Sequence, residues 1–203
     1  SYEAVCSTKR RPAVRSVGTV ASGTGDVSPG LPALLAQNDI MVMYVETGNE
    51  AVTAPSGWAH VTDSPVSMAT ADATRLNVLW KRASASESAP TVTNPGDHAV
   101  ARIIAVSGCL ETGDPWDVTS SSTEATADAS VSITGDTTTV DDCLILAGVA
   151  TGTDVAATAH ISAFANADLQ DVTEQLDNWV TDGNGGGLGV CSGTKVTAGA
   201  YGA

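Results

Sequence analysis

Aromatic residues, basic residues and long apolar runs are all scarce in this 203-residue chain. Aromatics make up 4% of it, with a single Phe, so a core must be built mainly from Val, Ala, Ile and Leu. Nine Lys and Arg stand against 23 Asp and Glu, which gives a formal charge of −14. Nucleic acid and anionic lipid would repel such a chain and are not expected as its main partners. No apolar run approaches the roughly 18 residues of a membrane span, so no membrane partner is expected.

Metal and disulfide motifs are missing as well. The four cysteines are widely spaced and form no CxxC pair, so neither a zinc site nor any other cofactor is expected. The first residues contain no apolar stretch typical of a signal peptide. We therefore expect free thiols in a chain that folds in a reducing cytoplasm. The cysteines are Cys6, Cys109, Cys143 and Cys191.

Catalytic motifs are equally poor, and the sequence predicts a protein that is not an enzyme. No GxSxG elbow is present. Asp97 and His98 are adjacent, but neighbours in a strand point to opposite faces, so we expect the two side chains not to converge. The segment DGNGGG at 182–187 lacks the glutamate that completes an EF-hand loop, and no Lys or helix follows it to form a phosphate cradle. It is interpreted as a glycine-rich hairpin.

Short strands dominate the pattern that is present. Apolar residues make up 42% of the chain and recur with period two or in short solid runs, bounded by Gly, Pro, Asn, Asp and Ser. No long segment has helical period, although one helical turn is possible at 32–37. Strands are predicted at 14–20, 40–47, 57–63, 74–83, 98–108, 129–134, 143–150 and 186–195. Weaker predictions cover 159–166 and 169–181, the second being either a strand or a short helix.

Turn signals every 8–15 residues or so favour an all-β fold, an antiparallel β-sandwich of jelly-roll type. Residues 16–203 are predicted to form one such domain, because no linker or internal repeat divides them. Residues 74–83 alternate clearly. Their two expected faces are Leu76, Val78 and Trp80 on one side, and Arg75, Asn77, Leu79 and Lys81 on the other.

Charge is distributed unevenly. Residues 1–15 hold four basic residues and one acidic residue, a net of +3, whereas 16–203 hold five basic and 22 acidic residues, a net of −17. Residues 1–15 are therefore predicted to be a basic N-terminal arm. The arm is either a solvated terminus or an anchor on an acidic neighbouring subunit, and nucleic-acid binding is a weaker third option. Its candidate contact residues are Lys9, Arg10, Arg11 and Arg15.

Four tryptophans supply the largest side chains. Trp58 and Trp80 are expected to plug the ends of the sandwich. Trp116 and Trp179 are flanked by acidic and amide residues, which leaves two interpretations open. They are either structural or, together with Asp182 and Asn184, the stacking and hydroxyl-binding groups of a carbohydrate site.

Several segments resemble a family of bacteriophage virion proteins. They lie at 16–47, 53–61, 74–92, 96–108, 115–122 and 164–203, and DNWVTDGNGGG at 177–187 is the most specific. The resemblance implies a β-sandwich with a structural or decorating place on the particle, and it transfers no catalytic residues. The family continues past a segment like 200–203 into another apolar strand, so a further strand is implied there.

This resemblance gives two hypotheses. The first is a non-enzymatic capsid decoration (cement) protein that binds the major capsid protein or other virion subunits. Such a protein would form a homo-oligomer, with a trimer favoured, and would be located in the virion after assembly in the host cytoplasm. The alternative is a carbohydrate-binding adhesion module of a head fibre or tail.

Overall fold

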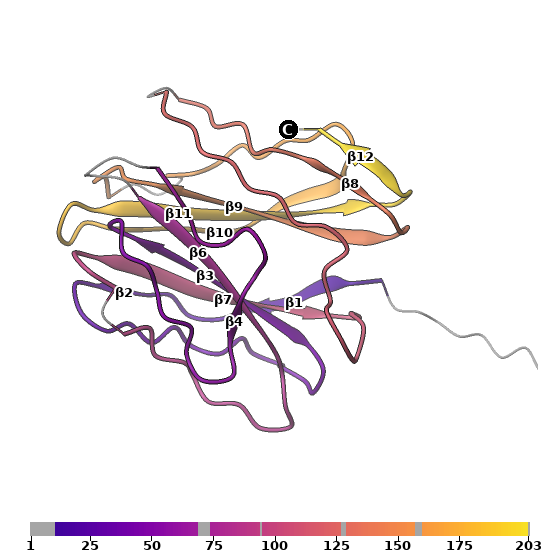
Figure 1. The fold of residues 1–203 in the computed structure, drawn as a ribbon, viewed down its shortest axis with the longest axis horizontal. Coiled ribbons are helices and arrows are strands. Elements are labelled where there is room, and N and C mark those ends of the chain that lie inside the picture. Colours follow the sequence, from indigo (N-terminus) through magenta and orange to yellow (C-terminus); the bar gives the residue numbers. More distant parts are fainter. Residues whose placement is uncertain (1–10, 69–73, 94, 127–128, 157–159, 203) are drawn as a thin grey trace, which may run out of the picture.

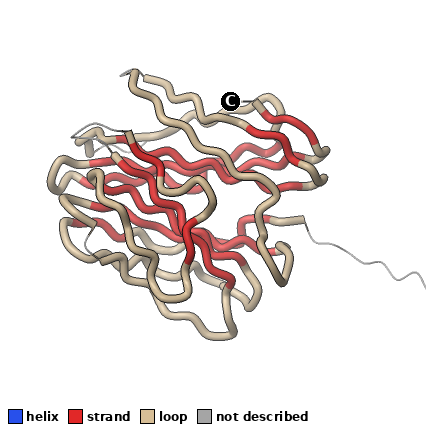
Figure 2. Tube along the Cα trace, in the orientation of Figure 1, coloured by secondary structure: helices blue, strands red, loops and turns tan. Residues whose placement is uncertain are grey.

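The computed structural model describes residues 11–68, 74–93, 95–126, 129–156 and 160–202. These residues form twelve β-strands, arranged as antiparallel sheets stacked on one another (Figures 1 and 2). The twelve strands and their stacked sheets make the protein an all-β sandwich, as the sequence predicts. The described residues contain no helix that is long and apolar enough to cross a membrane.

The large sheet contains the first seven strands. They are β1 (Ala13–Val17), β2 (Ala21–Gly23), β3 (Ile40–Thr47), β4 (Ala59–His60), β5 (Val66–Ser67), β6 (Arg75–Arg82) and β7 (Ala99–Ser107). The order is β1-β7-β3-β6-β4, with β2 paired to β7 and β5 paired to β6. All pairs are antiparallel. Strand β3 lies at the centre of the sheet.

Two smaller sheets complete the fold. Strands β9 (Cys143–Thr151), β10 (Gln170–Val180) and β11 (Gly186–Lys195) form a sheet with the order β10-β11-β9. Strands β8 (Asp136–Thr138) and β12 (Gly199–Tyr201) form a two-stranded sheet. The jelly roll expected from the sequence is not confirmed, because β1–β7 all lie in one sheet and β9–β11 all lie in another.

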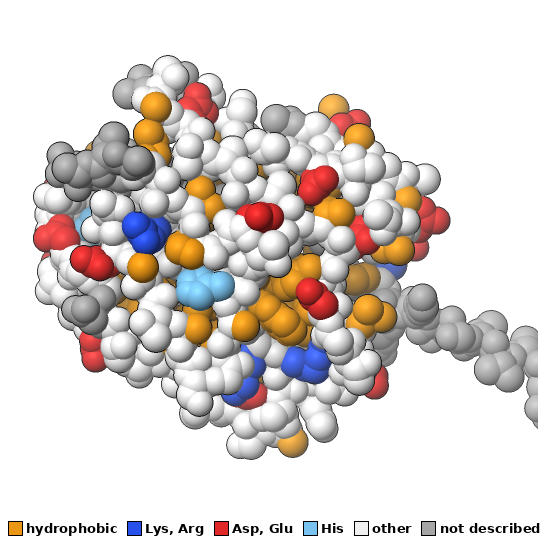
Figure 3. All heavy atoms as spheres, in the orientation of Figure 1, with side chains coloured by type: hydrophobic (Ala, Val, Ile, Leu, Met, Phe, Trp, Pro, Cys, Tyr) orange, Lys and Arg blue, Asp and Glu red, His pale blue; other side chains and the backbone are white. Residues whose placement is uncertain are grey.

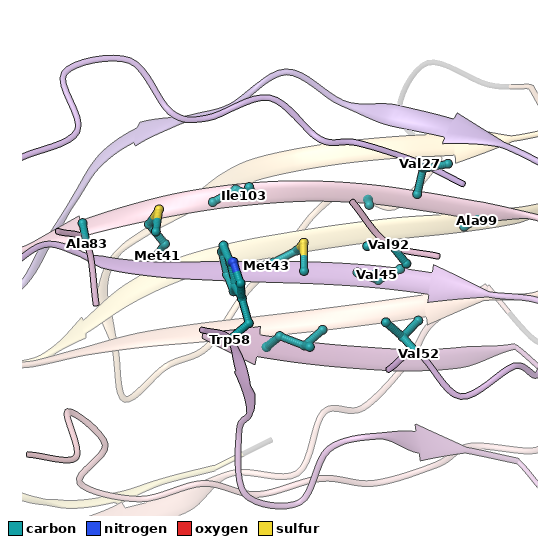
Figure 4. Close-up of a cluster of buried hydrophobic side chains, with 12 residues drawn as sticks. Val27, Met41, Met43, Val45, Val52, Trp58, Ala83, Val92, Ala99 and Ile103 are labelled. Atoms are coloured by element: carbon teal, nitrogen blue, oxygen red, sulfur yellow. The ribbon is translucent and has the colours of Figure 1, made fainter. Parts of the chain in front are cut away.

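Both faces of β3 are covered, which explains its solid apolar sequence. All eight of its residues are buried. Met41, Met43 and Val45 point to a face covered by loops, where they pack with Trp58 and other side chains (Figure 4). The alternate side chains of β3 point to the three-stranded sheet. That second cluster is built from residues on both sheets, including Ile40, Val42, Tyr44, Ile104, Leu176, Leu188 and Val190.

Strand predictions from the sequence are largely confirmed. The ranges 40–47 and 186–195 coincide with β3 and β11, and 143–150 falls one residue short of β9. The segment 169–181 is a strand, β10, and not a helix. The two faces predicted for 74–83 are also found, since Leu79 lies in the loop-covered cluster while Leu76, Val78 and Trp80 pack against the cluster between the sheets.

Other predictions are wrong. Residues 129–134 do not form a strand, because their side chains are mostly exposed, Val131 to 51%, and bury no face. Backbone N–H groups there donate to side chains of the preceding segment, from Ser132 to Glu124 and from Thr134 to Ser122. Residues 160–166 are irregular as well, and position 159 lies outside the described residues. Only Ala59–His60 of the range 57–63 is a strand, and 32–37 contains a turn without a helix.

Glycine allows the two main sheets to approach closely. Gly148 of β9 faces Tyr44 of β3, and a Cβ atom added at Gly148 would lie 2.7 Å from a ring carbon of Tyr44. On the outer face of β11, Gly189 lies under Ile161, where a Cβ atom would be 2.6 Å from the Ile161 side chain. Real Cβ atoms do not approach so closely, so a larger residue at either position forces its neighbours to move.

We expect Gly148→Ala to lower the free energy of unfolding by about 1–3 kcal/mol, because the added methyl overpacks the contact with Tyr44. The matched control is Gly25→Ala, where no atom lies within 4 Å of the added Cβ. The control should change stability by less than about 0.5 kcal/mol. Equilibrium urea unfolding measures both variants. Equal stability of the two would contradict this packing.

Candidate functional site

An ionisable cluster lies at one end of the large sheet. We define it as Glu46, Thr74, Asp97 and His98. His98 Nε2 is 3.2 Å from Glu46 Oε1, and His98 Nδ1 is 3.3 Å from Asp97 Oδ2. The Thr74 hydroxyl donates to Glu46 Oε1 at 2.7 Å. One imidazole therefore lies between two carboxyl groups.

The contact between Asp97 and His98 corrects the sequence prediction that they would not converge. Asp97 lies in a turn and His98 connects that turn to β7, so neither residue lies in the strand itself. The alternation of side chains that separates neighbours in a strand does not apply in a turn. Glu46, the third ionisable residue of the cluster, is not predicted from the sequence. The signal for it is a single carboxyl group inside the apolar run IMVMYVET at 40–47.

Burial dominates the electrostatics of the cluster. Glu46 is 0% exposed and His98 is 2% exposed. Burial raises the pKa of the Glu46 carboxyl, although its hydrogen bonds to His98 and Thr74 oppose the shift. The hydrogen bond to Glu46 raises the pKa of His98, while burial opposes this. Because both pKa values are raised, the buried pair retains a proton at pH values where free Glu and His side chains have lost it.

The cluster also holds the glycine turn between β10 and β11 in place. Asp97 Oδ2 accepts the backbone N–H of Asn184 at 2.5 Å, and this bond, together with His98, lowers the pKa of the Asp97 carboxyl. Gly183 and Gly185 have positive φ values of 58° and 68°. Gly186 packs directly against the Glu46 carboxyl group, so a side chain there would collide with it. The segment 182–187 is therefore a hairpin, as predicted, and it links the two main sheets.

Most polar atoms of the cluster are paired within the chain. Both imidazole nitrogens already face carboxyl groups of the same chain. The Thr74 hydroxyl donates to Glu46 Oε1, the same oxygen that faces His98 Nε2, so this hydroxyl is held within the cluster. Glu46 Oε2 has no hydrogen-bond partner among the described residues, but it is buried away from solvent.

The basic residues predicted to contact a partner are partly bound within the chain. Lys9 and Arg10 lie outside the described residues. Arg11 Nη2 is 2.5 Å from Asp142 Oδ1, on an exposed surface. Arg15 belongs to β1, and its Nε is 2.6 Å from Asp39 Oδ2, a carboxyl group that is only 4% exposed. The first fifteen residues are thus not all a free arm, since β1 starts at Ala13.

Trp116 is separated from the other residues of the predicted carbohydrate site. Its ring lies edge-on to Trp80, with 6.1 Å between ring centroids, and Trp80 pairs with Val42. Trp179 pairs with Gly187, next to the glycine turn that contains Asp182 and Asn184. That turn lies beside Glu46. Val42, opposite Trp80, and Glu46, beside the turn, are four residues apart in β3, which corresponds to about 13 Å. The structure therefore does not bring Trp116 together with Trp179, Asp182 and Asn184.

Thiols and metal ligands add no reactive centre in the part of the chain that the structure describes. Cys109, Cys143 and Cys191 are free thiols, and burial raises the pKa of each, which makes them poor nucleophiles. Cys6 lies outside the described residues. No group of three or more His, Cys, Asp and Glu among the described residues is placed to hold a metal ion.

The ionisable cluster predicts a particular dependence of stability on pH. The ordinary pKa is 4.5 for Glu46 and 6.5 for His98, and folding raises both pKa values. Each group therefore keeps its proton in the folded protein at pH values where the unfolded chain has lost it. The free energy of unfolding should therefore fall as the pH rises through these ranges. We expect Tm to be several degrees lower at pH 9 than at pH 5, measured by differential scanning calorimetry.

Glu46→Gln should reduce this decline in Tm, because the amide is uncharged at every pH. The exposed carboxyl of Glu111 provides the matched control, and Glu111→Gln should keep the wild-type slope. A Tm that rises between pH 5 and pH 9, or an unchanged slope in Glu46→Gln, would contradict the assignment.

Comparisons of the chain with protein-family models, with curated proteins and with solved structures find no significant match.

Proposed function

We propose that the protein is a non-enzymatic structural protein of a bacteriophage particle, a decoration (cement) protein that binds the outside of the head shell. The observation that carries the proposal is the division of charge, with a net of +3 in residues 1–15 and −17 in residues 16–203. Within the chain, basic N-terminal residues already form two ion pairs with acidic groups of the sandwich, Arg11 with Asp142 and Arg15 with Asp39. The resemblance of the segments 16–47 and 177–187 to phage virion proteins supports the same role.

These ion pairs lie at one end of the sandwich and involve both main sheets. Asp39 directly precedes β3 of the large sheet, and Asp142 directly precedes β9 of the three-stranded sheet. The N-terminal residues thus bind acidic groups that the sandwich presents at this end. Lys9 and Arg10 carry two further charges, for which carboxylates of a neighbouring subunit are the complementary partner.

The rest of the surface suits a subunit that stands among many copies. Residues 16–203 have a net charge of −17, and Figure 3 shows acidic side chains spread over the face that it draws, with basic side chains at fewer places. An acidic exterior limits nonspecific binding to nucleic acid. Basic N-terminal residues on an acidic body allow one copy to bind the next, or the shell beneath it.

The edges of the three-stranded sheet support assembly into an oligomer. Strand β10 has two register irregularities opposite β11 and exposed acidic residues such as Asp171 and Glu174, features that protect an edge from pairing. Strand β9 pairs with β11 in regular register over nine residues and contains no charged residue. Among the described residues only β11 pairs with it, so a neighbouring chain could add a strand along its other edge.

The closed ionisable cluster supports a non-enzymatic role. Its only histidine is 2% exposed and lies between two carboxyl groups of the same chain. The alternative hypothesis, a carbohydrate-binding adhesion module built from Trp116, Trp179, Asp182 and Asn184, is less well supported because Trp116 lies apart from the other three.

Purified virions of the phage that encodes this sequence test the proposal. We expect mass spectrometry to find many copies per particle, in proportion to the major capsid protein. Cryo-electron microscopy should place them on the outer surface of the head, with a trimer at each site. Absence from purified virions, or density confined to the tail, would refute the decoration role.

The anchoring role of the N-terminus calls for a variant that leaves β1 intact. Removal of residues 1–10 does so, whereas removal of 1–15 would also delete part of the pairing between β1 and β7. We expect the shortened protein, and the Lys9→Glu/Arg10→Glu variant, to leave the particle at lower salt concentration than the wild type, because screening weakens ion pairs.

The matched control is Lys9→Arg/Arg10→Lys, which preserves both charges and should be retained like the wild type. Sedimentation of particles over a series of NaCl concentrations measures the retained fraction. Equal retention of the truncated and wild-type proteins would exclude the anchor.

A further inference from the structure

A polar groove lies on the side of the large sheet that faces away from the three-stranded sheet. Its volume is about 410 Å³, and it opens between the loops 53–58 and 88–93. The residues that matter for its chemistry are Thr53, Ser56, Trp58, Lys81, Thr91 and Thr93. None of them belongs to the ionisable cluster or to the N-terminal segment.

The walls of the groove are fixed by the hydrophobic core beneath them. Trp58 is 8% exposed and packs in the same cluster as Met43 and Leu79, as Figure 4 shows for Trp58 and Met43. Val92 is fully buried and pairs with Val27 through two backbone hydrogen bonds of 3.0 and 2.8 Å. A site whose walls are already ordered loses little conformational entropy when a ligand binds.

Hydroxyl groups are available along the groove. Within the described part of the chain, the hydroxyls of Thr53, Ser56 and Thr93 make no hydrogen bond, whereas the Thr91 hydroxyl is paired with Ser28 at 2.9 Å. Each free hydroxyl can donate one hydrogen bond and accept two. The groove therefore offers several unused donors and acceptors at fixed positions.

Lys81, the basic side chain among the described residues that line the groove, is neutralised. Lys81 Nζ is 2.6 Å from Glu87 Oε2, and the Glu87 side chain is only 4% exposed. Glu87 Oε1 accepts the backbone N–H of Ser84 at 2.7 Å, which fixes the carboxylate in place. An ammonium group has three N–H donors, so Lys81 retains two after it binds Glu87. The pair thus supplies directed hydrogen-bond donors without a net charge.

We propose that this groove binds a neutral saccharide of one or two sugar rings. Sugar hydroxyls match the free Ser and Thr hydroxyls and the remaining donors of Lys81, while the lining residues Pro55, Pro90 and Trp58 offer apolar contacts to C–H groups. The volume lies near the lower end of the range for small-molecule sites. The acidic body disfavours sulfated, phosphorylated or carboxylated sugars.

A glycan array that contains neutral and anionic oligosaccharides, probed with the purified full chain, is the first test. We expect binding to neutral glycans only, and isothermal titration calorimetry with the best neutral disaccharide should then give a measurable Kd. Absence of neutral binders, or binding to anionic glycans alone, would overturn the proposal. Location on the virion is a separate measurement, so failure here leaves the decoration role standing.

Two variants assign the binding to this groove. Ser56→Trp fills it from an exposed position and should abolish binding, whereas Ser121→Trp, on an exposed loop elsewhere, should not. Thr53→Val/Thr93→Val removes two hydroxyls with little change in volume and should weaken binding at least tenfold, whereas Thr62→Val should leave it unchanged. Thermal unfolding checks that all four variants fold. Wild-type affinity in folded Ser56→Trp would exclude this groove as the site.

Discussion

Burial of β3 on both faces is the constraint on which the rest of the structure depends. A strand with eight buried residues needs a cover on each side. The three-stranded sheet covers one side, and loops anchored by Trp58, Val52 and Val92 cover the other. Glu46 is the one carboxyl group in this strand, so its solvation by water must be replaced within the protein. His98 and Thr74 supply that replacement, which explains why an ionisable cluster forms at the end of β3.

The scarcity of aromatic residues determines how the sheets pack. With few large side chains, the space between sheets is filled by Val, Ile and Leu, and the few rings present need room made by glycine. Gly148 provides that room for Tyr44, and Gly186 provides it for the Glu46 carboxyl. On the outer face of β11, Gly187 and Gly189 accept the side chains of residues 160 and 161 in the same way. The glycine content of β11 is therefore a packing requirement as well as a feature of its turn.

The sequence predicts strands well wherever burial decides the structure. Residues 40–47 and 186–195 were placed correctly because a solid apolar run and a glycine-bounded run each have few alternatives. Prediction failed at 129–134, where the alternation of Val131 with Ser and Thr suggested a strand but no second layer covers it. It failed also at Asp97 and His98, because the position of a turn, and the contact with Glu46 about 50 residues earlier, depend on tertiary structure.

The polar groups of the candidate sites differ in what they do for the fold. Glu46 and the glycine turn are at the end of the sandwich where β3 finishes, and their polar groups are used to join the two sheets. Asp39 and Asp142 precede strands at the opposite end, where they bind Arg15 and Arg11. The free hydroxyls of the groove lie on the loops, which cover the core through other side chains. The buried acid–histidine cluster thus stabilises the fold by joining its two sheets, whereas the groove hydroxyls of Thr53, Ser56 and Thr93 make no hydrogen bond within the described residues.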